Sequence, residues 1–364
     1  MKIILSGGGT LGPVIPLLAI AGAITTKYPE AQFIWVGTRA GPERGIVEKA
    51  EMPFFVIGAG KWRRYPSLLN IIDLVKIVVA FFQSGVILLK QKPVLLISAG
   101  GFISVPLHWA GWLVRIPAWV HQQDVKVGLA NRLMLPLAAK VTCALEETAV
   151  KLAKFKTEWI GNPCRSLAAT NEEGHALRMR WKIPVAAPVI LVTGGGTGSG
   201  SINRLIVEAL PLLPPEWHVI HLTGPSRPRQ IPAPAAGVYP NYHVAEFFSS
   251  EMPAAYRLAC LVVSRAGFGT LTELAALAKP AIIIPLPGTH QEDNAHYLAR
   301  RQAVEIMEEK AGSGPKLAQL IKELISDSPR AASLGIKLSA ILPRAAAEKM
   351  IAVVEDLTKI NRPR

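Results

Sequence analysis

Two glycine-rich turns, far apart in the chain, have the composition of phosphate-binding loops. Residues 7–12 of ILSGGGTLGPVIP follow an apolar run, and residues 194–200 of ILVTGGGTGSGSIN do the same. Glycine lets a ligand approach the backbone closely, and the N–H groups at a helix N-terminus attract anions. Each turn therefore predicts an anion-binding loop between a strand and a helix. A tight turn without a ligand is the alternative for each.

Two common nucleotide-binding motifs are excluded. Gly7, Gly9 and Gly12 match GxGxxG formally, but the second strand ends QFIWVGT, without the acidic residue that would hold a ribose. Neither turn continues into GK[ST], which excludes a P-loop. We therefore do not expect a nicotinamide- or ATP-binding fold.

The second half of the chain adds two polar clusters suited to a sugar. SRAGFGTLTELAAL carries Glu273 near the start of a helix, and PLPGTHQEDNA places His290, Gln291 and Asn294 after a strand. A carboxylate there can accept hydrogen bonds from sugar hydroxyls or can serve only the helix N-terminus, and both interpretations stay open. No metal-binding spacing such as HExxH occurs, so we expect no metal.

Strands and helices alternate along the chain, which predicts an α/β fold. We expect two doubly wound parallel sheets with helices on both faces. The expected strands lie in KIILSGG, QFIWVGT, PFFVIG, PVLLISAGG, PAWVHQQ, VTCALE, APVILVTGGG, WHVIHLTG, YHVAEFF, CLVVSRAG and PAIIIPLPG. Ligands bind such domains at the carboxyl ends of the strands, and we expect them in a cleft between the two domains.

A polar stretch divides the chain. GNPCRSLAATNEEGHALRMRWKIPVAAP breaks the alternation, and we expect a linker at 161–187 between domains at 1–160 and 188–364. The C-terminal stretch AAAEKMIAVVEDLTK is expected to be a helix, able to pack back on the first domain.

The charge of the chain indicates an anionic partner. The 364 residues carry a formal net charge of +14. The three cysteines form no CxxC pair, which disfavours a disulfide framework and a structural zinc site. The opening run MKIIL is too short for the core of a secretory signal and is expected to be the first strand.

A basic and apolar segment at 58–92 is expected to contact an anionic membrane surface. Its contact residues are expected to be Lys61, Arg63, Arg64, Lys76, Phe81 and Phe82. The uncharged run at 77–89 has 13 residues, against about 20 needed to span a bilayer, so no crossing is expected. A buried helix with snorkelling lysines is the alternative. Nucleic acid is not expected, because no RNP-like aromatic pattern accompanies the charge.

Taken together, these stretches resemble the MurG family of glycosyltransferases. The similar segments are GGTLGPVIP, AGGFISVP, HQQDVKVGLANR, GNPCR, GGGTGSGSIN, AEFFSSEMPAAY, SRAGFGTLTELAALAKPAIIIPLP and HQEDNA. The resemblance implies a GT-B fold, with two Rossmann-like domains facing across a cleft. It implies inverting transfer of N-acetylglucosamine from UDP-N-acetylglucosamine to the C4 hydroxyl of an undecaprenyl-diphosphate-linked muramoyl-pentapeptide, without a cofactor. It further implies peptidoglycan biosynthesis at the cytoplasmic face of the cell membrane, as a peripheral protein.

The resemblance also implies roles for residues of this sequence. For the donor, Glu273 would hold the ribose, Arg165 and Thr270 would hold the diphosphate, and the backbone of Phe247 or Phe248 would meet the uracil. Further donor contacts are expected from Gly195, Gly196, Thr197, Gly198, His290, Gln291 and Asn294. The first domain would bind the acceptor at Thr10, Leu11, Gly12 and Asn131, with the acceptor diphosphate against Thr10, Gly12 and Asn131.

The first domain departs from the family pattern at three places. Leu11 and Pro13 replace a glycine and a histidine of the first loop. Gln122 and Asp124 replace a glutamate and an amide, and Phe102 replaces a tyrosine. These departures affect the acceptor site, whereas the donor site matches well.

The departures also bear on the general base that removes the hydroxyl proton. Pro13 has no titratable group, so Asp124 or His121 is expected to be that base. Two alternative functions stay open: a GT-B transferase acting on another lipid or a small-molecule acceptor, and a non-catalytic UDP-sugar-binding protein.

Overall fold

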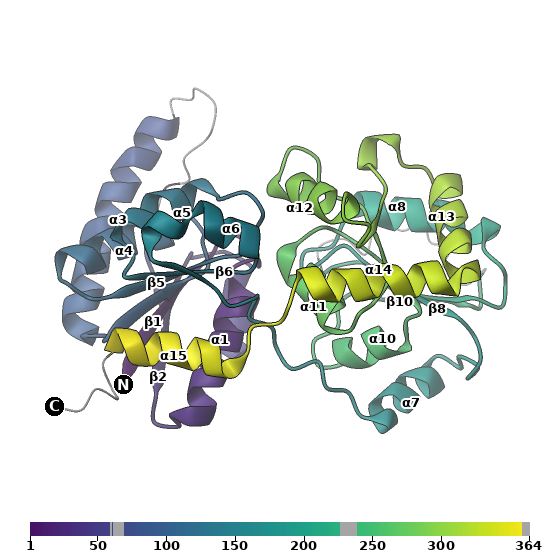
Figure 1. Cartoon of the computed structure of the whole chain (residues 1–364), viewed down its shortest axis with the longest axis horizontal. Coiled ribbons are helices and arrows are strands. Elements are labelled where there is room, and N and C mark those ends of the chain that lie inside the picture. The colour runs from purple at the N-terminus through teal and green to yellow at the C-terminus, as the bar shows by residue number, and fades with distance from the viewer. Residues whose placement is uncertain (59, 61–68, 226–238, 359–364) are drawn as a thin grey trace. The chain divides into compact units, whose positions relative to one another are not determined.

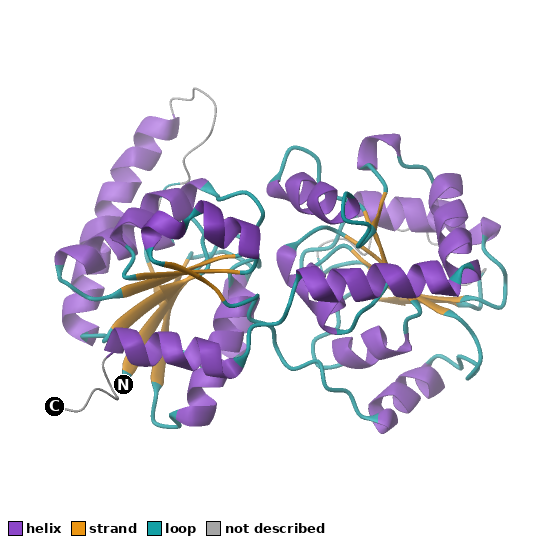
Figure 2. Cartoon of the chain, in the orientation of Figure 1, coloured by secondary structure: helices purple, strands orange, loops and turns teal. Residues whose placement is uncertain are grey.

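The computed structural model describes residues 1–58, 60, 69–225 and 239–358 of the chain. The chain divides into two compact units, one formed by Met1–Arg165 with Arg344–Arg364 and the other by Ser166–Pro343. Each unit contains one parallel sheet with helices packed around it (Figure 2). The predicted α/β class with two doubly wound sheets is confirmed.

The first unit is built on a seven-stranded sheet. Its strands are β1 (Lys2–Ser6), β2 (Gln32–Gly37), β3 (Phe54–Val56), β4 (Leu95–Ser98), β5 (Ala118–Gln122), β6 (Lys140–Cys143) and β7 (Thr157–Trp159). The order is β3-β2-β1-β4-β5-β6-β7, and every neighbouring pair is parallel. The chain changes direction across the sheet between β1 and β4, which is where doubly wound sheets bind ligands.

Helices pack around this sheet, and one of them comes from the C-terminal end of the chain (Figure 1). They are α1 (Val14–Lys27), α2 (Glu43–Lys49), α3 (Leu69–Gln91), α4 (Ser104–Leu113), α5 (Leu129–Met134), α6 (Glu146–Lys151) and α15 (Ala347–Thr358). From α15, Met350, Val353 and Val354 join the core that contains β1, β2 and α1. Tyr28, next to α1, donates a hydrogen bond of 2.6 Å to Glu355. The C-terminal helix therefore belongs to the first unit.

The second unit is built on a six-stranded sheet. Its strands are β8 (Val189–Thr193), β9 (His218–Leu222), β10 (Tyr242–Ala245), β11 (Leu261–Ser264), β12 (Ala281–Ile283) and β13 (Glu305–Ile306). The order is β10-β9-β8-β11-β12-β13, again with parallel neighbours. The switch point lies between β8 and β11, so the turns after these two strands are neighbours.

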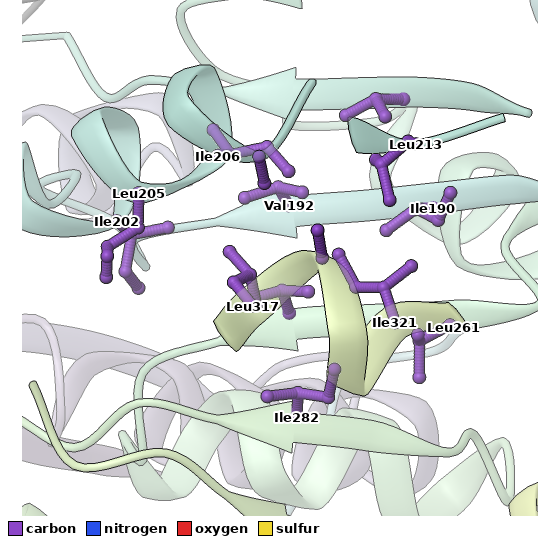
Figure 3. Packing of buried hydrophobic residues seen from close by; sticks show 14 of the residues in the cluster. Ile190, Val192, Ile202, Leu205, Ile206, Leu213, Leu261, Ile282, Leu317 and Ile321 are labelled. Carbon is purple, nitrogen blue, oxygen red and sulfur yellow. The ribbon is translucent and has the colours of Figure 1, made fainter. Parts of the chain in front are cut away.

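The core of the second unit joins helices to the central strands. The principal helices are α7 (Asn171–Arg180), α8 (Gly200–Ala209), α10 (Met252–Leu258), α11 (Phe268–Ala276), α12 (His290–Ala299), α13 (Gly314–Ser326) and α14 (Ser328–Ile341). Ile206 of α8, Leu317 and Ile321 of α13 and Val192 of β8 lie in one buried cluster (Figure 3). Burial of these apolar faces fixes the start of α8 at the end of β8.

Helix α7 lies inside the stretch that we expected to be a linker. Thr170 and Glu173 form a capping box at its N-terminus. Arg257 of α10 donates a hydrogen bond of 2.6 Å to the side chain of Asn171 of α7, and this bond connects the two helices. Residues 161–165 belong to the first unit and 166–187 to the second.

Candidate functional site

The turn after β8 is shaped by glycines that no other residue replaces easily. Gly195 and Gly198 have φ angles of +80° and +71°, which side chains rarely adopt. A Cβ on Gly198 would lie 2.2 Å from the carbonyl oxygen of Thr223, whereas a Cβ on Gly195 would meet nothing within 4 Å. One side of the turn thus packs on the loop after β9, and the other is open to a ligand.

A buried arginine supports this turn from behind. Arg265, 8% exposed, donates to Ser199 Oγ at 2.7 Å and to Ser201 Oγ at 2.8 Å. It also forms an ion pair with Glu309, and Ser201 donates to the same carboxylate at 2.8 Å. Ser199 caps α8 by accepting from the N–H of Ile202. Sequence reasoning missed Arg265; its signal was an arginine directly after a buried strand.

Helix α11 carries the two predicted donor residues Thr270 and Glu273. Thr270 is half-buried. Glu273 is 6% exposed and accepts a hydrogen bond of 2.9 Å from the hydroxyl of Tyr256. This tyrosine holds the carboxylate in one orientation, at the helix that follows β11.

The loop after β12 holds the other predicted sugar contacts. Gln291 Oε1 accepts from the N–H of Leu286 at 3.2 Å. Asn294 is 1% exposed and donates to the carbonyl oxygen of Ala266 at 3.2 Å, which links α12 to the turn after β11. His290 is exposed at the start of α12. These three residues follow β12, at the same edge of the sheet as the glycine turn.

The two phenylalanines after β10 differ in exposure. Phe247 is 47% exposed, whereas Phe248 is 2% exposed and stacks on Trp181 at 5.8 Å between ring centroids. Only Phe247 therefore presents its ring to solvent.

The remaining predicted donor residues are at least partly exposed. Arg165 is partly exposed and is the last residue of Met1–Arg165 in the first unit. Gly196 is half-buried and Thr197 is exposed in the glycine turn.

In the first unit, three loops meet at the carboxyl ends of β1, β4 and β5. Gly9 has a φ of +80°, and a Cβ there would lie 2.6 Å from the ring of Phe102. Gln123 donates through Nε2 to the carbonyl oxygens of Gly12 at 3.3 Å and Ala99 at 3.4 Å. The amide of Gln123 therefore joins the glycine turn at 7–12 to the loop after β4.

The predicted acceptor residues lie on these loops. Thr10 and Gly12 are exposed and Leu11 is partly exposed. Asn131, near the start of α5, is 5% exposed and donates to Gln122 Oε1 at 2.6 Å. The structure thus brings together the loop at 7–13 and the segment that holds Gln123 and Asn131.

His121, one of the two expected bases, lies in the protein interior and contacts two buried polar side chains. It is fully buried, and its Nδ1 and Nε2 lie 2.8 Å from Thr142 Oγ1 and from Asn162 Oδ1. Burial lowers the pKa of His121 to about 4. Because Asn162 Oδ1 only accepts, we infer that the neutral ring carries its proton on Nε2 and accepts at Nδ1. Both ring nitrogens are occupied, so this geometry does not support His121 as the base.

Asp124, the other expected base, lies at the surface. It is partly exposed just after β5, and its carbonyl oxygen accepts from Gln122 Nε2 at 2.7 Å. Of the two candidates, only Asp124 has a side chain that solvent reaches.

Helix α3 exposes an apolar face. Its exposed apolar residues are Leu74, Val75, Val78, Val79, Phe82, Val86 and Leu89. Phe82 is 67% exposed, whereas Phe81 is partly buried and packs on the core. Lys76 is exposed and lies 3.7 Å from Asp73. Lys61, Arg63 and Arg64 lie outside the described residues. Among the described helices, none is both long and apolar enough to cross a membrane.

Comparison with known proteins agrees with this architecture. Residues 3–143 match the N-terminal domain of glycosyltransferase family 28, and residues 189–349 match its C-terminal domain. The N-acetylglucosamine transferase for N-acetylmuramyl-(pentapeptide) pyrophosphoryl-undecaprenol from Legionella pneumophila (strain Paris) is 31% identical over 100% of this chain and 99% of its own length. The Listeria monocytogenes serotype 4a (strain HCC23) protein of the same name is 33% identical over 97% of this chain and 99% of its own length.

Solved structures share the fold. Acinetobacter baumannii MurG has a TM-score of 0.72 at 23% identity, covering 98% of this chain and 99% of that one. The UDP-GlcNAc 2-epimerase of Neisseria meningitidis has a TM-score of 0.69 at 14% identity, covering 98% and 100%. The fold is the expected GT-B fold. From its full-length similarity to the curated transferases, the chain belongs to the MurG family within glycosyltransferase family 28.

Proposed function

We propose that this protein transfers N-acetylglucosamine, with inversion, from UDP-N-acetylglucosamine to the C4 hydroxyl of undecaprenyl-diphosphate-linked N-acetylmuramoyl-pentapeptide. The observation that carries this proposal is the similarity to transferases named for this reaction along the full length of both chains. The second unit binds the donor and the first unit binds the acceptor.

The donor diphosphate lies on the glycine turn after β8. The open side of Gly195 and the N–H groups of Gly196 and Thr197 face negative charge there, just before the N-terminus of α8, whereas the N–H of Gly198 closes the turn by donating to the carbonyl oxygen of Gly195 at 3.0 Å. Charge grows on the diphosphate as UDP leaves, so these fixed dipoles stabilise the transition state more than the ground state. Arg165 and Thr270 add to this stabilisation.

The rest of the donor lies along the same edge of the sheet. Glu273, oriented by Tyr256, accepts from the ribose hydroxyls. The uracil lies at the backbone of Phe247 or Phe248. His290, Gln291 and Asn294, on α12, bind the N-acetylglucosamine.

The acceptor lies on the loops of the first unit. Thr10, Leu11, Gly12 and Asn131 contact it, and Asp124 removes the proton of its attacking hydroxyl as the general base. Two observations support Asp124. Its side chain is partly exposed just after β5, and its neighbour Gln123 donates to the carbonyl oxygen of Gly12 in the turn at 7–12.

The protein associates with the cytoplasmic face of an anionic membrane through α3. The exposed apolar residues of this helix, with Phe82 the most exposed of them, provide area to bury among lipid. Lys76 and the basic residues Lys61, Arg63 and Arg64 attract the anionic headgroups.

A second function has one observation in its favour. Leu11, Pro13, Gln122 and Asp124 differ from the family pattern in the acceptor loops, which favours a transferase for another lipid or small-molecule acceptor. Loss of the usual base would also suit a non-catalytic UDP-sugar-binding protein.

One assay separates the three functions. Purified protein is incubated with UDP-N-acetylglucosamine and the lipid-linked muramoyl-pentapeptide. Transfer to this acceptor supports the proposal. Transfer only to other acceptors supports the second function, and donor binding without any turnover supports the third.

A further inference from the structure

Four aromatic rings form a stack in the second unit, and one of them belongs to the loop after β10. His218 of β9 and His243 of β10 stack with their ring centroids 5.2 Å apart and an interplanar angle of 10°. Trp181, at the C-terminal end of α7, stacks on His243 at 5.3 Å and 9°, and on Phe248 at 5.8 Å and 22°. The stack therefore connects two strands of the sheet to the loop segment at 246–248.

The histidine end of the stack is buried and neutral at pH 7. His218 and His243 are 9% and 8% exposed, and Nδ1 of His218 lies 2.9 Å from Nε2 of His243. Burial and the neighbouring His218 lower the pKa of His243 to about 4. Burial and the charge of Arg178 also lower the pKa of His218. Two neutral imidazole rings can share one N–H···N hydrogen bond, which fixes both rings where Trp181 packs on them.

The C-terminal end of α7 is attached to the loop after β10 at two points. Trp181 stacks on Phe248, and Arg180 pairs with Glu251 at 2.7 Å between the nitrogen and the carboxylate oxygen. Because Phe248 is only 2% exposed, the main chain at this residue cannot move far without disturbing its contact with Trp181.

The same loop is joined to the glycine turn at 194–200 through the loop after β9. The N–H of Gly224 donates to the carbonyl oxygen of Glu246 at 2.8 Å. A Cβ on Gly224 would lie 2.3 Å from the Cα of Gly198, so the loop after β9 packs directly on the glycine turn. Recognition of a base by main-chain N–H and C=O groups depends on where those groups are held. The stack is thus placed to hold the segment at 246–248.

We propose that Trp181 is a positioning residue for the donor site, which holds the main chain at 246–248 where it binds uracil and so sets the preference for uracil over other bases. Trp181 acts through Phe248 and not by contact with the nucleotide. This inference rests on one part of the proposed function, the placement of the uracil at the backbone of Phe247 or Phe248.

The test compares UDP with CDP, which have the same ribose and diphosphate but differ at the hydrogen-bonding edge of the base. Calorimetric titration gives Kd of both nucleotides for the wild type, Trp181→Ala, Trp181→Phe and Met179→Ala. Met179 is the matched control, because it lies on α7 and is 65% exposed. CDP cannot form the hydrogen bonds that are specific for uracil. A change in these bonds therefore alters Kd for UDP alone, whereas general damage to the donor site raises both values.

Trp181→Ala is expected to raise Kd for UDP about tenfold, the loss of about one hydrogen bond, and to leave Kd for CDP within about twofold of the wild type. Trp181→Phe keeps a ring in the stack and retains most of the preference for UDP, and Met179→Ala retains all of it. Trp181→Leu, which keeps apolar volume without a ring, replaces Trp181→Ala if that variant does not fold. An unchanged ratio of the two Kd values in a folded variant without the ring, whether both rise or neither does, overturns the inference.

Failure of the proposed function gives a different result. A wild type that prefers UDP but transfers nothing to the lipid-linked acceptor contradicts the proposed function alone, because the titrations use no acceptor. A wild type that binds UDP and CDP equally has no uracil-specific site, which overturns the inference together with the proposed donor.

Discussion

Arg265 donates a hydrogen bond of 2.7 Å to the hydroxyl of Ser199, the residue that caps α8. The arginine follows β11 and the serine follows β8, so this contact joins the two turns at the switch point of the sheet. This contact holds the start of α8 in one orientation, as the proposed binding of a diphosphate to its N–H groups requires.

Arg265→Lys is expected to raise KM for UDP-N-acetylglucosamine about tenfold and to leave KM for the acceptor unchanged. One guanidinium nitrogen donates to Ser199 and Ser201 and the other donates to the carbonyl oxygens of Ile284 and Pro285, and a single ammonium group cannot replace both. Arg204→Lys is the control, since Arg204 is an exposed residue of α8 that lies 3.7 Å from Glu208. Steady-state kinetics with each substrate varied in turn give the answer. Equal changes of KM for UDP-N-acetylglucosamine in the two variants would contradict the proposed role of Arg265 in holding the start of α8.

Gly198→Ala is expected to abolish most donor binding, because the new Cβ would collide with Thr223 and the residue has a φ of +71°. Gly269→Ala is the matched control, since Gly269 lies in α11 with open space around its Cα. Calorimetric titration with UDP measures both. Wild-type affinity in a folded Gly198→Ala protein would show that the turn does not hold the diphosphate.

Where the residues of the proposed donor site lie in the fold could largely be predicted from the sequence. The glycine turns, the cluster at 285–295 and Glu273 follow apolar strands, and parallel strands bring their carboxyl ends to one edge. Arg265 was missed because its serine partners lie 64 and 66 residues away in the sequence, which local patterns do not reveal. The burial of His121 could not be predicted, because a histidine after a strand looks the same in the sequence whether its ring is buried or exposed.

The fold was predictable to a similar extent. The strands in apolar runs were found, including the short β3 and β12, whereas β7 and β13 were not, because TEW and EI form no apolar run. Helix α7 was overlooked inside a polar stretch. Its capping box, Thr170 with Glu173, was a readable signal, but its polar composition indicated a linker.

Asp124→Asn is expected to lower kcat by a factor of about 10² or more while KM for the donor stays unchanged, since the amide cannot accept the hydroxyl proton. Single-turnover transfer measures the chemical step. Asp293→Asn, on α12 of the other unit, controls for the charge change. A kcat within about twofold of the wild type would remove Asp124 as the base.

Protein stability is expected to fall with acid partly through His121. Its usual pKa is 6.5 and burial lowers it to about 4. Between these values the unfolded chain binds a proton that the folded chain does not, so the free energy of unfolding falls as pH falls. Burial lowers the pKa of His108 to about 4 and of His221 to about 3, in the same direction.

Urea unfolding at pH 7 and pH 5 tests this effect. His121→Asn is expected to be less stable at pH 7, because it loses the bonds to Thr142 and Asn162, and to show a smaller loss on acidification. An unchanged pH dependence in His121→Asn would contradict the structural assignment.

Helix α3 is expected to carry membrane binding. The double variant Phe82→Ser with Leu89→Ser removes two side chains that are 67% and 65% exposed, and it should bind anionic vesicles more weakly than the wild type. Val150→Ser, at a site 72% exposed on α6, is the control. Sedimentation with phosphatidylglycerol vesicles at low salt measures both, and equal binding of all three proteins would exclude α3.

A crystal structure with UDP-N-acetylglucosamine tests the central claim most directly. The account predicts the diphosphate on the turn at 195–198, within hydrogen-bonding distance of the N–H groups of Gly196 and Thr197, and the ribose against Glu273. A nucleotide bound anywhere else on the protein would contradict it.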